Sequence, residues 1–221
     1  MMQTFDTPTP ITAVLALPAG RVQVIAADRA DTTVEVLPTE PARNSDVRAA
    51  AQTTVALTDG VLRIHTQQRP NRLLGPSGSL TVTVRLPAGS DVEVKAAGSE
   101  LRGVGRLGDL TVDGAYRTKV DEAGHVRLTA IDGDVEIGRL TGPAEISTAR
   151  GDIRIGAAVS GTVVLRTGSG DISVAAAAGV SAALDAGTGT GRISNALRND
   201  GTAELDIHAT TGQGDITARS L

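Results

Sequence analysis

The chain has 221 residues, a formal net charge of −4 at pH 7 and an isoelectric point near 5.4. This acidic balance, without a dense Lys/Arg run, argues against nucleic acid as the partner. The absence of cysteine excludes a disulfide scaffold and a thiolate metal site. No apolar run is long enough to predict a membrane span, and the N-terminal residues lack the pattern of a signal peptide. We therefore expect a cytoplasmic protein, displayed on the surface only by an unrecognised route.

The apolar residues are aliphatic almost throughout. Phe5 and Tyr116 are the only aromatic residues, although 40% of the chain is apolar. A compact globule of this size normally fills its centre with several rings. The reliance on Val, Ile, Leu and Ala therefore predicts a core only a few side chains across.

Residues 1–88 form a strand-rich head that is continuous with the rest of the chain. Alternating apolar and polar residues between turn residues predict strands over 12–17, 21–26, 33–37, 53–57, 61–66 and 80–86. Asp59-Gly60 predicts a hairpin turn between 53–57 and 61–66. A single helical turn is predicted at 46–52, and the segment 67–79, with its Pro and Gly residues, is predicted to be a loop.

From residue 89 to 221 the chain repeats one phrase, a turn glycine followed by a short alternating strand. The glycines of the phrase are 18, 19, 21 and 23 residues apart, at Gly133, Gly151, Gly170, Gly191 and Gly214. A period near 20 residues is typical of stacked coils, because one coil is too small to bury its apolar face without its neighbours.

Each coil is predicted to hold two strands whose apolar side chains face a shared core. Stacking then places Ile137 over Ile155, and Ile155 over Val174, with polar residues on the outside. The final strand, 215–219, stops almost at the C-terminus. We expect it to leave an open edge through which the chain could self-associate end to end.

A row of carboxylates follows the repeat glycines. Its members are Asp134, Asp152, Asp171 and Asp215, and Arg192 interrupts it. Stacking would bring these side chains together, and hard cations take oxygen ligands, so the row is a weak candidate for a cation ladder. The interpretation we favour is a solvent-facing turn in which each Asp bonds to its own backbone.

No catalytic constellation emerges from the remaining polar residues. His65, His125 and His208 share no ligand spacing. Ser169 stands in a turn, without the following helix that a hydrolase nucleophile needs. Arg150-Gly151-Asp152 spells the integrin-binding tripeptide, but its Gly-Asp pair belongs to the repeat. We expect no catalytic residue, no cofactor and no dedicated metal site.

The order of these motifs resembles a bacterial adhesin family of unknown function that is built of β-strand repeats. The resemblance covers nearly the whole chain. It rests on Gly20-x-Val22-x-Val24, on Thr33-Val34-Glu35-Val36, on Val82-x-Val84-x-Leu86, and on the Gly-Asp-Ile phrases at 151, 170 and 214. It implies adhesion or surface display and supplies no catalytic residues. The preference for Arg over Lys, with abundant Ala and Gly, is similar to actinobacterial proteins.

The fold predicted from these patterns is all-β: a parallel β-helix (β-solenoid) over 89–221 with the strand-rich head over 1–88. The favoured function is a non-enzymatic scaffold or binding module for a protein or cell-envelope partner. The alternative is a carbohydrate- or cation-binding β-helix protein that acts on an acidic glycan. Such proteins need clustered carboxylates and usually aromatic platforms for sugar rings, and one Tyr and one Phe argue against them.

Overall fold

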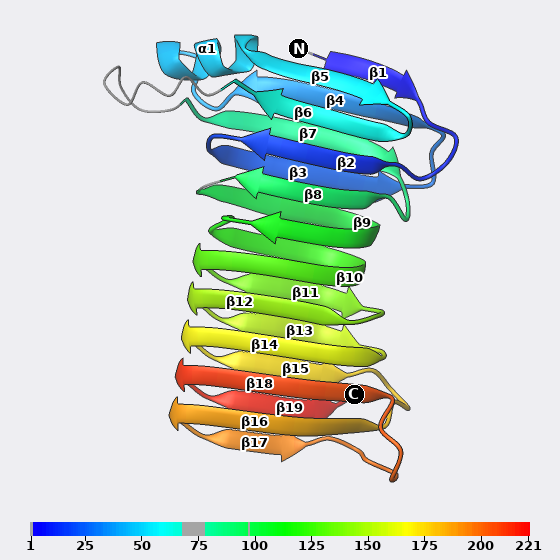
Figure 1. The fold of residues 1–221 in the computed structure, drawn as a ribbon, viewed down its shortest axis with the longest axis vertical. Coiled ribbons are helices and arrows are strands. Elements are labelled where there is room, and N and C mark those ends of the chain that lie inside the picture. Colours follow the sequence, from blue (N-terminus) through cyan, green and yellow to red (C-terminus); the bar gives the residue numbers. More distant parts are fainter. Residues whose placement is uncertain (1, 68–77, 97) are drawn as a thin grey trace.

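The computed structural model describes residues 2–67, 78–96 and 98–221, which form nineteen strands and one helix (Figure 1). The elements are β1 (Met2–Asp6), β2 (Thr12–Leu17), β3 (Gly20–Ala27), β4 (Asp31–Pro38), α1 (Asn44–Ala51), β5 (Thr53–Thr58), β6 (Val61–Thr66), β7 (Leu80–Pro87), β8 (Asp91–Ala96), β9 (Ser99–Asp113), β10 (Arg117–Asp132), β11 (Val135–Leu140), β12 (Ala144–Arg150), β13 (Ile153–Ala158), β14 (Gly161–Ser169), β15 (Ile172–Ala176), β16 (Ala182–Thr190), β17 (Ile193–Ala196), β18 (Leu205–Gln213) and β19 (Ile216–Ser220). No helix within these residues is long and apolar enough to cross a membrane.

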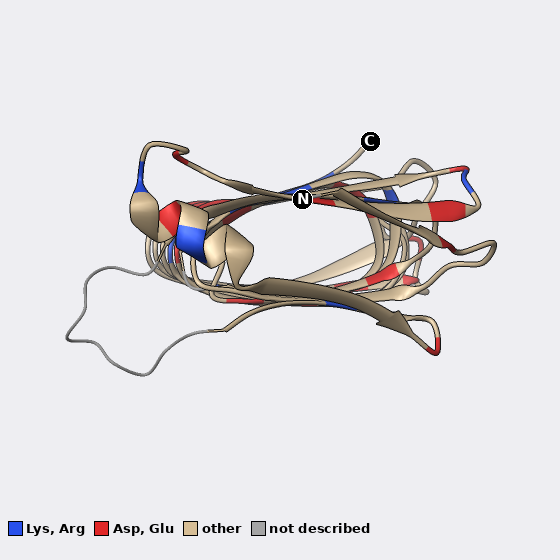
Figure 2. Cartoon of the chain, turned by 90° about the horizontal axis from the view of Figure 1, so that it is seen from above, with Lys and Arg blue, Asp and Glu red and all other residues tan. Residues whose placement is uncertain are grey.

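The strands lie in two facing layers around a thin core, as the view along the stack shows (Figure 2). Layer A runs in the order β1-β4-β7-β3-β9-β10-β11-β13-β15-β19-β17. Layer B runs in the order β5-β6-β2-β8-β9-β10-β12-β14-β18-β16. The long strands β9 and β10 belong to both layers, and elsewhere a coil is one strand from each layer.

The core is aliphatic, as the composition predicts. The inward-facing positions predicted from the alternation are buried in nearly every coil, and Ile137 pairs with Ile155, which pairs with Val174, as expected from stacking. Two predicted core positions depart from this pattern. Leu184 is only partly buried and Ile193 is 46% exposed, and both belong to the coil of β16 and β17. The core side chains are therefore less buried in the last coil, at one end of the molecule.

The N-terminal end of the stack closes with antiparallel pairing and a helix. Strand β1 pairs antiparallel with β4, β4 with β7, and β5 with β6. The helix predicted at 46–52 is present as α1, whose buried residue Ala49 belongs to the core. Asp46 is buried here because its carboxylate accepts hydrogen bonds from the amides of Glu40 and Ser79 and from the Ser45 hydroxyl.

Two coils lie out of chain order. Strands β2 and β3 insert between the β6–β7 and β8–β9 pairs, and β18 and β19 insert between the β14–β15 and β16–β17 coils. The prediction that 215–219 leaves an open edge is therefore wrong. Strand β19 lies inside layer A with a parallel neighbour on each side, and the free edges at this end belong to β16 and β17 (Figure 1).

The all-β prediction is confirmed, but the strand pairing is mixed. Along the stack, the strands from β6 and β7 to the C-terminal end pair in parallel. The N-terminal end adds three antiparallel pairs, so the fold is not a purely parallel helix. The division at residue 88 stays a prediction. Most of the predicted loop at 67–79 lies outside the described residues.

Candidate interaction site

The turn glycines are required by the closeness of neighbouring coils. Gly151 and Gly170 have φ angles of +131° and +149°, in the region that favours glycine. A Cβ atom at Gly170 would lie 2.1 Å from the carbonyl oxygen of Gly151, and one at Gly151 would lie 2.3 Å from that of Gly133. Any other residue at these corners would push adjacent coils apart.

The predicted carboxylate row is present at the same corner, and each carboxylate bonds to the next coil. Oδ1 of Asp134 accepts a hydrogen bond from the amide of Asp152 at 3.0 Å, and Oδ1 of Asp152 accepts one from Asp171 at 2.9 Å. Asp171 accepts the amide of Asp215 at 2.8 Å, although 44 residues separate them. The favoured interpretation, that each Asp bonds to the backbone of its own turn, is therefore wrong in its partner, because the amide belongs to the neighbouring coil.

The interruption of the row by Arg192 has a structural reason. Oδ1 of Asp215 accepts the amide of Arg192 at 2.9 Å, so the amide of Arg192 is bound by a carboxylate like those of Asp152, Asp171 and Asp215. Its coil is the last in space, and no further coil offers an amide that a carboxylate at 192 would bind. The row therefore follows the order of the coils in the stack, which differs from their order in the chain. It ends at the last coil, beyond which no backbone amide needs a carboxylate acceptor.

A second row at the corner consists of threonines that the sequence analysis missed. The hydroxyl of Thr167 donates to the carbonyl of Gly151, that of Thr211 to Gly170, and that of Thr188 to Gly214, at 2.9–3.0 Å. Each Thr stands three residues before its own turn glycine, which is a signal that the sequence offers. The polar atoms of the corner thus join one coil to the next.

The carboxylates and hydroxyls of this corner are engaged in hydrogen bonds to the backbone of neighbouring coils. Within the described residues, no group of three or more His, Asp or Glu side chains is placed to hold a metal ion. The three histidines lie apart: His125 approaches Asp109 at 3.9 Å, His208 approaches Asp185 at 3.3 Å, and His65 lies on β6.

The tripeptide at 150–152 is likewise used internally. The Arg150 guanidinium pairs with Asp132 at 3.2 Å, and Asp152 pairs with Arg154 at 2.8 Å. Both charged side chains of this segment are therefore engaged in ion pairs within the molecule.

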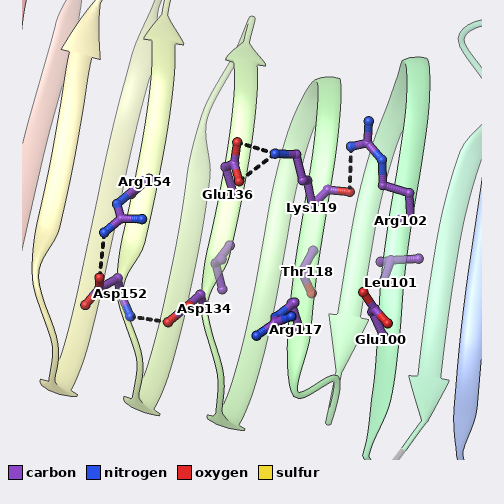
Figure 3. Close-up of a pocket in the computed structure, with 11 residues that line it drawn as sticks. Glu100, Leu101, Arg102, Arg117, Thr118, Lys119, Asp134, Glu136, Asp152 and Arg154 are labelled. Atoms are coloured by element: carbon purple, nitrogen blue, oxygen red, sulfur yellow. Dashed lines mark hydrogen bonds and ion pairs between the residues drawn. The ribbon is translucent and has the colours of Figure 1, made fainter.

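Charged side chains gather instead on the outer face of layer A, over β9, β10, β11 and β13 (Figure 3). We call this surface the ion-pair face, and it surrounds a hollow of about 340 Å³. Its charged lining residues are Glu100, Arg102, Arg117, Lys119, Asp134, Glu136, Asp152 and Arg154. Four cations and four anions therefore stand at fixed positions on neighbouring strands, which are about 4.8 Å apart.

The strand register sets which charges meet. Lys119 lies opposite Arg102 on one side and opposite Glu136 on the other. Like charges directly opposite each other are unfavourable. The conflict is relieved because Lys119 binds Glu136 at 2.7 Å and Arg102 binds Asp121 at 2.7 Å.

Arg117, at the centre of the ion-pair face, has no ion pair within the described residues. Its register partner Glu100 binds Arg21 at 3.2 Å, and the nearby Asp134 accepts the amide of Asp152. The Arg117 guanidinium instead lies 5.9 Å from the ring centre of Tyr116. Figure 3 shows Arg117 between Glu100 and Asp134, with no interaction drawn to it. Chemically, this arrangement can bind an anionic group.

Comparison with known proteins agrees with the resemblance expected from the motifs. The family model described as Toastrack DUF4097 matches residues 15–220. No match was found among curated proteins.

Three solved structures are similar over nearly the whole of both chains. A "putative cell adhesion protein" from Clostridium sporogenes has 11% identity and a TM-score of 0.43, covering 100% of this chain and 99% of that one. A "putative adhesin" from Bacteroides fragilis has 14% identity and a TM-score of 0.46, with 99% and 96% covered. A "putative lipid binding protein" from Parabacteroides distasonis has 11% identity and a TM-score of 0.43, with 97% and 96% covered. These scores are too low to transfer a function.

Proposed function

The chain belongs to the Toastrack DUF4097 family, and from this premise we propose that it is a non-enzymatic binding scaffold that holds a protein or cell-envelope partner on its ion-pair face. In this proposal the parallel-paired body acts as a β-solenoid that keeps charged side chains at fixed spacing. Such a surface suits recognition, because side chains already held in place lose little freedom on binding.

The observation that carries this proposal is the uncommitted guanidinium of Arg117. Its neighbours on both sides are engaged, so an arriving carboxylate or other anionic group meets a planar donor without having to break an existing ion pair. Guanidinium groups bind such anions through two parallel hydrogen bonds. The surrounding pairs give the face a pattern of both signs, which favours a partner of complementary charge order.

Partner capture with matched variants tests the role of this face. Tagged chain is incubated separately with envelope and cytosolic fractions of the native host, crosslinked, and analysed by mass spectrometry. Arg117→Glu should lose a partner that the unchanged chain retains. Arg219→Glu is the control, because Arg219 is exposed on β19 of the same layer and has no ion pair in the described part of the chain. Identical partners for all three proteins would contradict the proposal.

Protease shaving of intact host cells then tests where the partner is met. Cleavage of the chain on intact cells would support adhesion or surface display. Protection of the chain, with recovery in the cytosolic fraction, would retire adhesion and leave an intracellular partner.

A further inference from the structure

The C-terminal end of the stack presents two free strand edges. Within the described residues β16 pairs only with β18, and β17 pairs only with β19. The outer side of each strand therefore carries backbone N–H and C=O groups without a strand partner. Such an edge is a template for pairing with another chain.

The core is also open between these two edges. Ile193 is 46% exposed, whereas Ile153, Ile172 and Ile216, at the same position of the inner coils, are at most 1% exposed. Leu184, on the facing strand, is only partly buried. The end therefore offers apolar surface flanked by two unpaired edges, a combination that a further coil would cover.

The edge strands carry few of the features that usually prevent pairing. The connection after β17 covers only the start of β16, where the amide of Ala182 donates to the carbonyl of Arg198 at 2.9 Å. Natural edge strands are protected by Lys, Pro, bulges or a covering element. Strand β17 has no charged residue, and β16 has a single one, Asp185, which contacts His208 at 3.3 Å on the outer face. The strand edges at this end are thus suited to pairing with another chain.

We propose that a second copy of this chain covers this end through a two-fold axis perpendicular to the two layers. The occupant must supply two strand edges at the spacing of the layers, with apolar side chains between them. An identical end meets this need, since the axis reverses strand direction and pairs β16 with β16 and β17 with β17, both antiparallel. Such a contact is self-complementary and closes at two copies.

The charges at the two corners of the end fit this axis. The turn that carries Arg192 lies at one corner, and the connection 197–204 lies at the other (Figure 1). The two-fold axis exchanges the corners, so Arg192 of one copy faces the connection of the other, which carries Asp200. Arg192 has no ion pair in the described part of the chain. Asp200 lies 3.7 Å from Arg198 and hydrogen-bonds with Ser181, and its side chain is still 52% exposed. Two equivalent ion pairs can therefore form.

The N-terminal end is a poorer occupant. Its edge strands β1 and β5 pair antiparallel with their neighbours, and α1 packs beside them. Phe5 and Ala50 already cover part of the core there. Head-to-tail assembly would place the open end against this dissimilar surface.

Molar mass against concentration tests the proposal, using the full chain in multi-angle light scattering. The unchanged chain should reach the mass of a dimer and stop there. Ile193→Lys should shift it to monomer, because the charge would be buried between copies. Ile131→Lys is the matched control, since Ile131 is 73% exposed on the outer face of β10, and it should stay dimeric. A monomeric unchanged chain at every soluble concentration would overturn the proposal, as would equal dimerisation of both variants.

Disulfide trapping tests the axis itself and does not depend on the stability of the end coil. The chain has no cysteine, so one introduced thiol has only its copy to pair with. We place the two-fold axis at Ser194, near the middle of the four-residue β17. Antiparallel pairing in this register brings residue 194 of both copies within the roughly 4.4–6.8 Å between Cα atoms that a disulfide spans. Ser194→Cys should form an oxidised dimer, while Ser173→Cys, in the same outer row on the internal β15, should not. Growth beyond the dimer, without trapping at Ser194→Cys, would indicate head-to-tail stacking and refute the two-fold contact.

Discussion

The two ends of the stack differ in how the core and the outermost strand edges are covered. At the N-terminal end, antiparallel strands and α1 close the core, and Asp46 ties the helix region to the chain before β7. At the C-terminal end, β16 and β17 continue the parallel pairing and then stop, leaving Ile193 exposed. The comparison shows that the repeat propagates a stack but does not terminate it. An end requires either a departure from the repeat or a partner.

The largest expected difference between an inner coil and the open end is the loss of unfolding free energy when a core side chain is truncated. Ile155→Ala removes a side chain that is 2% exposed between two coils. It should lower the free energy of unfolding by about 2–5 kcal/mol, the usual range for a buried aliphatic side chain. The same change at Ile193 should cost less than about 1 kcal/mol in the monomer, because less area is buried there. Urea unfolding at low protein concentration measures both, and equal losses would mean that the end is not open.

A glycine pair sharpens the comparison at the backbone. Gly170→Ala should cost about 1–3 kcal/mol, since its φ of +149° is strained for alanine and the new Cβ would meet the neighbouring coil. Gly187→Ala, in the edge strand β16, should be close to neutral because a Cβ there has no atom within 4 Å. Thermal unfolding of the two variants provides the measurement. A destabilised Gly187→Ala would show that something covers β16.

Substitutions in the carboxylate row should show a smaller difference in stability between an inner coil and the open end. Asp171→Ala removes the acceptor for the amide of Asp215 and should cost about 1 kcal/mol, the size of one hydrogen bond. Arg192→Asp restores the consensus residue at the open end but gains no amide to bind, so unfolding in urea should be unchanged. A clear gain in stability from Arg192→Asp would indicate a further coil-like neighbour.

At the closed end, pH is the probe. The amide of Ser79, with help from the Ser45 hydroxyl and the Glu40 amide, lowers the pKa of the Asp46 carboxyl below its usual value. A lowered folded-state pKa stabilises the protein above the unfolded-state pKa of about 3.9, and this stabilisation is lost as pH falls through the folded value. Asp46→Asn should therefore flatten the fall in melting temperature below about pH 4. An unchanged acid limb would show that Asp46 does not contribute to it.

Calcium provides the smallest expected effect. The Oδ1 atoms of the row accept backbone amides, which leaves each carboxylate only part of its oxygen for a cation. Isothermal titration with millimolar calcium should show no binding heat and no shift in melting temperature. Saturable binding that disappears in Asp152→Asn would restore the cation-ladder hypothesis.

Local patterns were enough to predict much of this fold. Alternation predicted the inward face of most strands, though not β1 or the exposed Ile193, and the glycine phrase predicted the corners, because both depend on residues close in the chain. The break in alternation predicted a single helical turn at 46–52, and the eight-residue helix α1 lies at Asn44–Ala51. The role of the threonines at 167, 188 and 211 was missed, since each hydroxyl bonds to a residue in another coil. Arg117 was missed for a similar reason, because its lack of an ion pair depends on what Arg21 and Lys119 bind.

The sequence by itself determined the all-β character, the thin aliphatic core and the corners at the repeat glycines. These follow from side-chain alternation and from glycine at positive φ, which are properties of neighbouring residues. Only the tertiary structure decided the order of the coils, and hence which coil is last. The coils present similar edges, so the choice between β17 and β19 as the neighbour of β15 rests on small differences at distant positions. The Asp215 carboxylate accepts an amide of the next coil, that of Arg192. No further coil lies beyond Arg192, which belongs to the last coil of the stack.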